Sequence, residues 1–422
     1  MTIVRRASQW LVLAGVALAA TASVSAADQL RSELSLASYT VRVNYDASLS
    51  ADEPRHRAVI AAGGAPERVR IGQIETDTVL RMGDATIGRP IARFTSFDVT
   101  LEAASGQWQL VFAETADPGK EVARVSLNRQ DSPVSSHLVA VLVPVTGMRG
   151  RILLRWGAYE AGADFVIAAA PRTPQQAGLA AERASQAAQG GRTGAGQAAP
   201  AAAAGVGPRL VNRAHDADNS AAGRARILAQ RGESALVLSD NRRVSVTFPR
   251  SFAKGEPPAP ARAGQPRAAA AGGRQPAAAA AARGRGLSVE GPDFGRLLST
   301  ADGNVVMLTQ GAVPRFISDA PVRFGSTVVP VANQVPGFPG AYGLWLRRAG
   351  GGWRLVFNDE PDVWGTQHNP ETDRVEIPLQ HTEGHDATRP FAVAVAPSGV
   401  DRGRLLVIWG PHEWTAEFVI GS

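Results

Sequence analysis

The chain has 422 residues, of which 44% are hydrophobic and 19% are charged, so it is long enough for two ordinary domains and too apolar to be disordered throughout. It contains no cysteine, which excludes disulfides, thiolate metal sites and cysteine nucleophiles. The formal net charge is +6 at pH 7, but the excess of arginine belongs to two low-complexity stretches.

Residues 1–26 have the pattern of a signal peptide. Arg5 and Arg6 precede an apolar run over residues 10–20, and small residues at 24–26 offer a cleavage site. No later apolar run approaches the roughly 20 residues that a membrane-spanning helix needs. We therefore expect a protein of the periplasm or one that is secreted, without a transmembrane segment once the signal is removed.

Two stretches, residues 171–222 and 255–286, consist mainly of Ala, Gly, Pro, Gln and Arg. They have almost no aromatic or β-branched side chains to bury, so we predict disordered linkers. Their arginines are diluted among Ala and Gly, unlike a dense nucleic-acid-binding patch. Nucleic acid is therefore not an expected partner, whereas weak contact of the linkers with an anionic membrane stays open.

Between the linkers, apolar and polar residues alternate, as in residues 40–45, 99–102, 243–248 and 391–395. This period of two, with Gly, Pro, Asn and Asp between the runs, predicts antiparallel sheet. The fold class is therefore expected to be all-β.

An internal repeat supports this prediction. Residues 151–167 and 404–420 align without a gap and share nine of seventeen positions, including Trp156 with Trp409 and Gly157 with Gly410. Gly-x-Trp-x-Leu-Val-Phe recurs at residues 106–112 and 351–357. We predict two tandem β-sandwich or barrel-like domains, over residues 27–170 and 223–422, with residues 255–286 inserted in the second.

The repeated motifs are typical of core packing. Alternation directs Trp353, Leu355 and Phe357 to one face of a strand, and it does the same for every second residue from 414 to 420. Gly157 and Gly410 each follow a Trp, where a residue free to adopt positive φ would let the chain turn into a closing hairpin.

The second copy resembles a known family. It carries Gly-Ala-Tyr-Gly-Leu-Trp at 340–345, Gly-Trp-Arg-Leu-Val-Phe-Asn at 352–358, Asp-Val-Trp-Gly-Thr-Gln at 362–367 and Asp-Arg-Val at 373–375. These motifs are similar to those of domain of unknown function 2911, whose members are exported bacterial β-rich proteins without an established activity. The first copy lacks the Trp-Gly-Thr segment, and residues 297–304 lack the Trp, Arg and Glu that the family commonly shows there.

The leading site hypothesis is a ligand-binding loop in the second copy. If Trp345 and Trp364 are exposed together, their flat faces could stack on sugar rings or grip a peptide, bordered by Gln367, His368 and Asn369. The alternative is that both indoles simply cover the core beneath a long loop.

The rival hypothesis is a metal centre. His381, His385 and Asp386 lie close together in a polar segment that we predict to be a loop, and they could hold a metal or a metal-activated water for hydrolysis. A solvated loop without metal is the plainer interpretation. No nucleophile elbow or phosphate-binding loop occurs, so no catalytic residue and no cofactor are predicted.

Taken together, these features predict an exported, non-catalytic binding or interaction module of the cell envelope. Its partner would be a glycan, a peptide or an envelope protein, and the alternative is a metal-binding protein or metal-dependent hydrolase.

Overall fold

A computed structural model describes residues 29–37, 39–61, 66–89, 94–168, 231–249, 292–308, 313–332, 340–361, 368–383 and 391–421. The predicted signal peptide (1–26) and the predicted linkers (171–222 and 255–286) lie outside these residues. In the described part of the chain, no helix has the length and apolar character needed to span a membrane.

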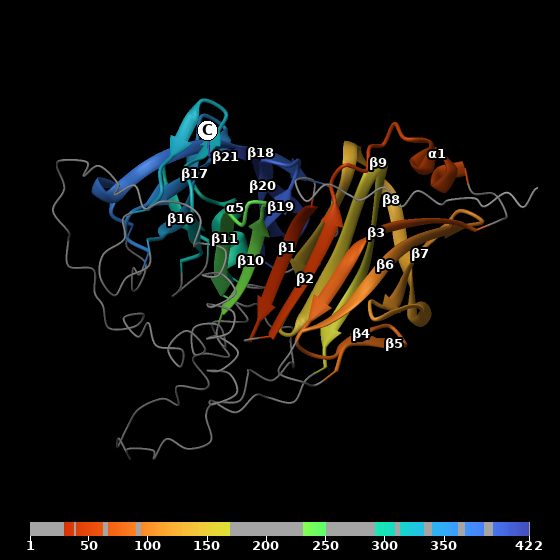
Figure 1. The fold of residues 1–422 in the computed structure, drawn as a ribbon. Helices are drawn as coiled ribbons and strands as arrows, with labels where there is room; N and C mark the ends of the chain where they lie inside the picture. Colours follow the sequence, from red (N-terminus) through yellow and green to blue (C-terminus); the bar gives the residue numbers. More distant parts are fainter. Residues whose placement is uncertain are drawn as a thin grey trace, which may run out of the picture.

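The first half is built from antiparallel strands and one short helix (Figure 1). Its elements are β1 (Gln29–Leu36), β2 (Tyr39–Asp46), α1 (Pro54–Ala61), β3 (Glu67–Thr76), β4 (Leu80–Met82), β5 (Ala85–Ile87), β6 (Thr95–Ala104), β7 (Gln107–Glu114), β8 (Asp117–Pro144) and β9 (Arg149–Ile167). The strands pair in the order β1–β2–β3–β6–β7–β8–β9–β4–β5.

The second half repeats this plan. Its elements are β10 (Arg231–Val237), β11 (Arg243–Pro249), α5 (Pro292–Leu298), β12 (Val305–Met307), β13 (Arg315–Ser318), β14 (Val322–Phe324), β15 (Thr327–Val329), β16 (Tyr342–Ala349), β17 (Gly352–Asn358), the 3-10 turn η2 (Pro370–Thr372), β18 (Asp373–Glu383), β19 (Ala392–Pro397), β20 (Arg402–Trp409) and β21 (His412–Ile420). The main order is β10–β11–β13–β16–β17–β18–β21–β14–β15. The predicted all-β antiparallel class is thus confirmed.

The repeat seen in the sequence is also a repeat of strand register. Trp108 pairs with Leu127 between β7 and β8, as Trp353 pairs with Leu379 between β17 and β18. Ala140 pairs with Leu154 in the first half, as Val393 pairs with Val407 in the second. Corresponding strands are thus paired through corresponding residues in both halves, so the two copies share one topology.

The predicted turns at the two glycines are present. Gly410 (φ 55°) lies between β20 and β21, which pair as a hairpin. Gly157 (φ 61°) lies inside β9, but an ion pair joins Arg151 Nε to Asp164 Oδ1 at 2.6 Å. Thirteen residues of straight strand would span about 40 Å, so β9 must double back at Gly157.

The two halves join along one strand pair. β1 pairs with β10 from Arg31 opposite Val237 to Leu36 opposite Gly232, so that a single sheet runs from one half into the other. Figure 1 shows the red and orange strands on one side of this junction and the green and blue strands on the other. The halves also contribute to one continuous hydrophobic core, and their predicted division into two tandem domains is therefore not established by the structure.

A second layer covers the core face of this sheet. The buried hydroxyl of Ser32 on β1 accepts a hydrogen bond from the Leu142 backbone N–H on β8 at 3.0 Å. At the equivalent place, Ser234 on β10 accepts one from Val395 N–H on β19 at 3.1 Å. Large aromatic side chains such as Trp108 and Trp409 lie in this core, and every second residue of β21 from Trp414 to Ile420 faces it as predicted.

Candidate functional site

The two copies differ in the connection that follows the Trp-x-Leu-Val-Phe strand. In the first half, β7 ends at Glu114 and β8 begins at Asp117. In the second half, residues 359–372 separate β17 from β18, and we call this segment the β17–β18 loop. Two predicted site residues in it, Trp364 and Gln367, lie outside the described residues, whereas His368 and Asn369 are described.

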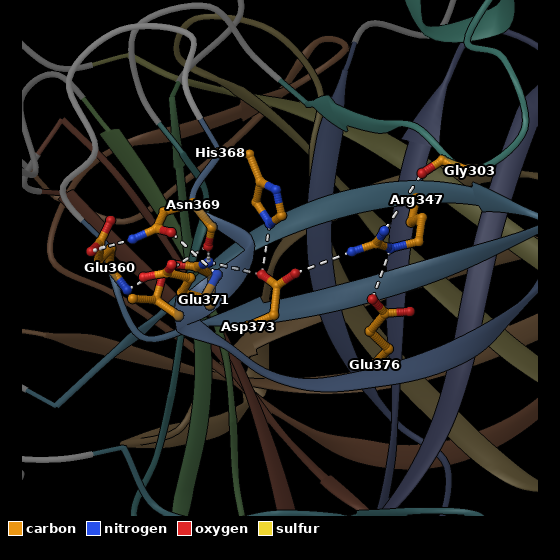
Figure 2. A network of polar contacts seen from close by, with 10 residues as sticks. Gly303, Arg347, Glu360, His368, Asn369, Glu371, Asp373 and Glu376 are labelled. Atoms are coloured by element: carbon orange, nitrogen blue, oxygen red, sulfur yellow. Dashed lines mark hydrogen bonds and ion pairs between the residues drawn. The ribbon is translucent and has the colours of Figure 1, made fainter. Parts of the chain in front are cut away.

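A carboxylate at the end of the loop organises a polar network (Figure 2). Asp373 Oδ1 lies 2.6 Å from Nε2 of His368 and accepts a hydrogen bond from Nδ2 of Asn358 at 2.8 Å. Asp373 Oδ2 accepts a hydrogen bond from Nη2 of Arg347 at 3.1 Å. The side chains of His368 and Asp373 are each 13% exposed, so this imidazole–carboxylate pair lies at the surface but is largely shielded from water.

The buried Asn358 ties the two ends of the loop together. Its Oδ1 accepts hydrogen bonds from the Glu360 N–H at 2.8 Å and from the Thr372 hydroxyl at 3.1 Å. Its Nδ2 also donates to the Asn369 carbonyl at 3.0 Å. The described ends of the loop are therefore held together by side-chain hydrogen bonds, because a buried amide needs partners for its polar atoms.

Asn369 stabilises the start of the turn η2. Its Oδ1 accepts a hydrogen bond from the Glu371 N–H at 3.2 Å, which is the usual role of asparagine as an N-cap. Its Nδ2 donates to Glu360 Oε1 at 3.3 Å. The side chain of Asn369 thus has a structural role in the described part of the loop.

The hypothesis of an exposed Trp345 is wrong. Trp345 is only 1% exposed and packs with Val313 and Val356, on the opposite sheet face from Tyr342 and Leu344. The ring of His368 lies edge-on to the indole with centroids 5.1 Å apart. Trp345 therefore supports the loop from beneath, which is the alternative that the sequence left open for this residue.

One ion pair beside the network belongs to the shared scaffold. Arg347 Nε on β16 lies 2.8 Å from Glu376 Oε1 on β18, so the pair reaches across the intervening strand β17. The equivalent positions in the first half are Glu102 and Arg124, which also form an ion pair, with the charges exchanged. Because an ion pair is present at this place in both copies, it stabilises strand packing in both. The His368–Asp373 pair, in contrast, has no counterpart in the first half.

The metal hypothesis is corrected in part. His381 lies on strand β18, opposite Trp414 in the register, and not in a loop. Its Nε2 lies 3.1 Å from Nδ1 of His412, a neighbour that the sequence analysis missed because 31 residues separate the two. The other two predicted ligands, His385 and Asp386, lie outside the described residues, within which no group of three or more His, Cys, Asp or Glu side chains could hold a metal.

The environment of His381 favours its neutral form. Partial burial lowers the pKa of His381, and the neighbouring His412 lowers it further, although Glu383 acts in the opposite direction. The ring of His381 stacks on Trp414 at 5.1 Å with an interplanar angle of 15°.

Comparison of the chain with protein-family models, curated proteins and solved structures gives no match. The resemblance to domain of unknown function 2911 therefore stays a prediction that rests on the motifs of the second copy.

Proposed function

We propose that this chain is an exported cell-envelope protein, related to domain of unknown function 2911, that acts as a non-catalytic binding or interaction module. The observation that carries the proposal is the β17–β18 loop, which the second copy adds to a scaffold that both copies share. Loops held by a rigid β scaffold are common sites of recognition. The signal-like pattern of residues 1–26 supports export.

The side chain of His368 supports recognition of a polar ligand. Asp373 holds Nε2, and Nδ1 makes no hydrogen bond within the described residues. When the carboxylate accepts the Nε2 proton, Nδ1 of a neutral ring presents a lone pair. A glycan hydroxyl or a peptide N–H could donate to it, which agrees with the predicted classes of partner.

The rest of the described network favours binding over turnover. The single proton of the Thr372 hydroxyl is already engaged by Asn358 Oδ1 at 3.1 Å and the Asn369 carbonyl at 2.9 Å, so this hydroxyl is not positioned as a nucleophile for His368. The Glu360 carboxylate accepts from Asn369, and that of Asp373 accepts from three neighbours. These carboxylates fix the loop rather than stand ready for proton transfer.

Titration of the mature chain with disaccharide–peptide fragments of peptidoglycan tests the proposal. We expect saturable binding by calorimetry and a change in tryptophan fluorescence, because Trp345 contacts His368. His368→Ala should weaken binding about tenfold, the effect of losing one hydrogen bond of about 1.4 kcal/mol.

The matched control is His137→Ala, which removes an exposed imidazole from the first half and should leave binding unchanged. Separate titrations with a chitin oligosaccharide and with the free stem peptide would assign the recognised moiety. Absence of binding to all three probes, or equal binding by His368→Ala and the unmodified chain, would contradict the proposal.

A further inference from the structure

The outer face of the second layer carries a compact apolar cluster that is separate from the main core. It consists of Val141 on β8, Ala392, Ala394 and Ala396 on β19, and Leu406 and Ile408 on β20, and we call it the outer cluster. These residues alternate with Leu142, Val393 and Val407, which face the core between the two layers. The outer cluster contains residues of both halves and therefore crosses their junction.

Each residue of the outer cluster is at most 7% exposed, although it points away from the core. In the described part of the chain, the partly buried hydrophobic side chains packed on the cluster are those of Val143 and Leu153. Leu153 pairs with Val141, and Val143 follows two residues later on the same strand, so both lie beside the cluster on the same sheet face. A face this well shielded needs a covering layer, and neighbours in the same sheet do not supply one.

The connection between β18 and β19 is too short and too polar to be that layer. β18 ends opposite His412 and β19 begins opposite Ile408, with β21 and β20 between them. Residues 384–391 must therefore cross three strand spacings, about 14 Å, at one end of the sheet. Two of them, Asp386 and Arg389, are charged. A longer and less polar segment is needed to cover the outer cluster.

The segment that follows β9 has the sequence signals of a helix. Thr173, Pro174 and Gln176 occupy the N-cap, first and third positions of a typical helix start, and Gly190 is typical of the position just after a helix end. These signals favour a helix over residues 174–189, which lie outside the described residues. Such a helix is about 24 Å long, close to the roughly 20 Å that β19 spans.

Alanine forms one whole face of this helix. The alanines at positions 177, 180, 181, 184, 187 and 188 recur at intervals of three and four residues and share that face. The opposite face includes Leu179, Glu182, Arg183 and Gln186. Small side chains let a helix lie close to a sheet, and β19 offers three alanines of the outer cluster for such contact.

The chain leaves β9 close to the outer cluster. The Ile167 N–H donates to the Met148 carbonyl at 2.9 Å, so β9 ends beside the β8–β9 connection, near which Val143 borders the cluster. Residues 168–173 can span up to about 20 Å, enough to bring the helix onto the cluster. We propose that residues 174–189 form a helix whose alanine face covers the outer cluster and fastens the two halves together. The predicted disorder of the linker would then apply from residue 190 onward.

Thiol labelling tests this cover, because the chain contains no cysteine of its own. Ala394→Cys places one thiol in the outer cluster, where the native side chain is 0% exposed. Its reaction with N-ethylmaleimide should be about a hundredfold slower than in the urea-unfolded chain, because labelling requires local opening. Adding Ala184→Asp, which puts a charge on the alanine face, should raise the rate about tenfold while tryptophan fluorescence stays unchanged.

Matched variants identify the covering segment. Gln186→Asp adds the same charge to the opposite helix face and should leave the labelling rate unchanged. Ala279→Asp places it in the other alanine-rich stretch and should also have no effect. In the chain without these changes, trypsin should cut after Arg183 about tenfold more slowly than after Arg192, which lies beyond the helix.

Four results would overturn the assignment. They are fast labelling of Ala394→Cys alone, no response to Ala184→Asp, an equal response to Gln186→Asp, and release by Ala279→Asp. Protection that disappears on dilution would also overturn it, because the outer cluster would then be covered by a second copy of the chain.

Discussion

Replacing Glu33 by glutamine tests whether the junction between the halves depends on a buried ionic cluster. The Glu33 side chain lies on β1 and is 6% exposed. Its carboxylate is 3.0 Å from Arg42 Nε of the first half and 2.5 Å from Arg243 Nη1 of the second. Burial alone raises the pKa of Glu33, but the charges of Arg243 and Arg42 outweigh it and lower the pKa to about 2.

The direction of this shift fixes the pH dependence. The unfolded chain takes up a proton near the ordinary value of 4.5, before the folded chain does, so the stabilisation is complete above pH 4.5 and disappears as the pH falls to about 2. A shift of this size corresponds to about 3 kcal/mol of folding free energy. About 2 kcal/mol of that should already be lost at pH 3.

Urea unfolding of the unmodified chain and of Glu33→Gln at pH 7 and at pH 3 measures the effect. At pH 7 the variant should be less stable by about 3–5 kcal/mol, because the charges of Arg42 and Arg243 lose a buried partner. At pH 3 the difference should shrink by about 2 kcal/mol, since glutamine does not titrate.

Glu75→Gln is the matched control, because this carboxylate lies 3.8 Å from Arg42 Nη1 but its side chain is 23% exposed. It should cost less than about 1 kcal/mol. If the difference between the unmodified chain and Glu33→Gln is the same at both pH values, the attribution to Glu33 is refuted.

Two further changes probe the shared scaffold. Ser32→Ala removes the partner of the buried Leu142 N–H, and Ser234→Ala removes that of Val395 N–H. Each change should lower the free energy of unfolding in urea by about 1–3 kcal/mol. A loss near zero for either variant would contradict the equivalent role of the two serines. Gly72→Ala should lower stability in thermal melts by more than about 2 kcal/mol or prevent folding, because a Cβ there would overlap the Asn44 carbonyl. At Gly106 the space is open and φ is 76°, so Gly106→Ala should lower stability by about 1 kcal/mol. Equal costs for the two glycines would show that the overlap is relieved by movement of β2.

Alternation and the internal repeat predicted the strands and their core faces. Trp353, Leu355 and Phe357 all face the core, because side chains alternate across a strand whatever its neighbours are. The pairing of β1 with β10 could not be predicted in this way. Alternation shows which face of a strand is buried but not which strand pairs with it. Ser32 and Ser234, which connect the two layers, look like ordinary polar residues in the sequence.

The sequence placed His368 in the correct loop but misjudged Trp345 and His381. The run from Tyr342 to Leu346 is continuously apolar, which indicates burial on both faces, and this signal argued against an exposed indole. The polar segment around His381 suggested a loop, but pairing with β21 extends the strand to Glu383. Asn358 and Asp373 were missed because their role depends on contacts across the loop.

Comparison of the two copies separates contacts that maintain the scaffold from those that the second half has added. The ion pair of Arg404 with Glu417 repeats that of Arg151 with Asp164, so both belong to the scaffold. Asn358, in contrast, stands where the first half has Ala113. His381 and His412 stand where the first half has the cation–aromatic pair of Arg129 and Tyr159. A duplicated fold keeps the contacts that folding requires in both copies, and side chains found in only one copy are free of that requirement. The polar residues peculiar to the second half are therefore the ones in which a binding role should be sought, with the first half acting as the support that extends the same sheet.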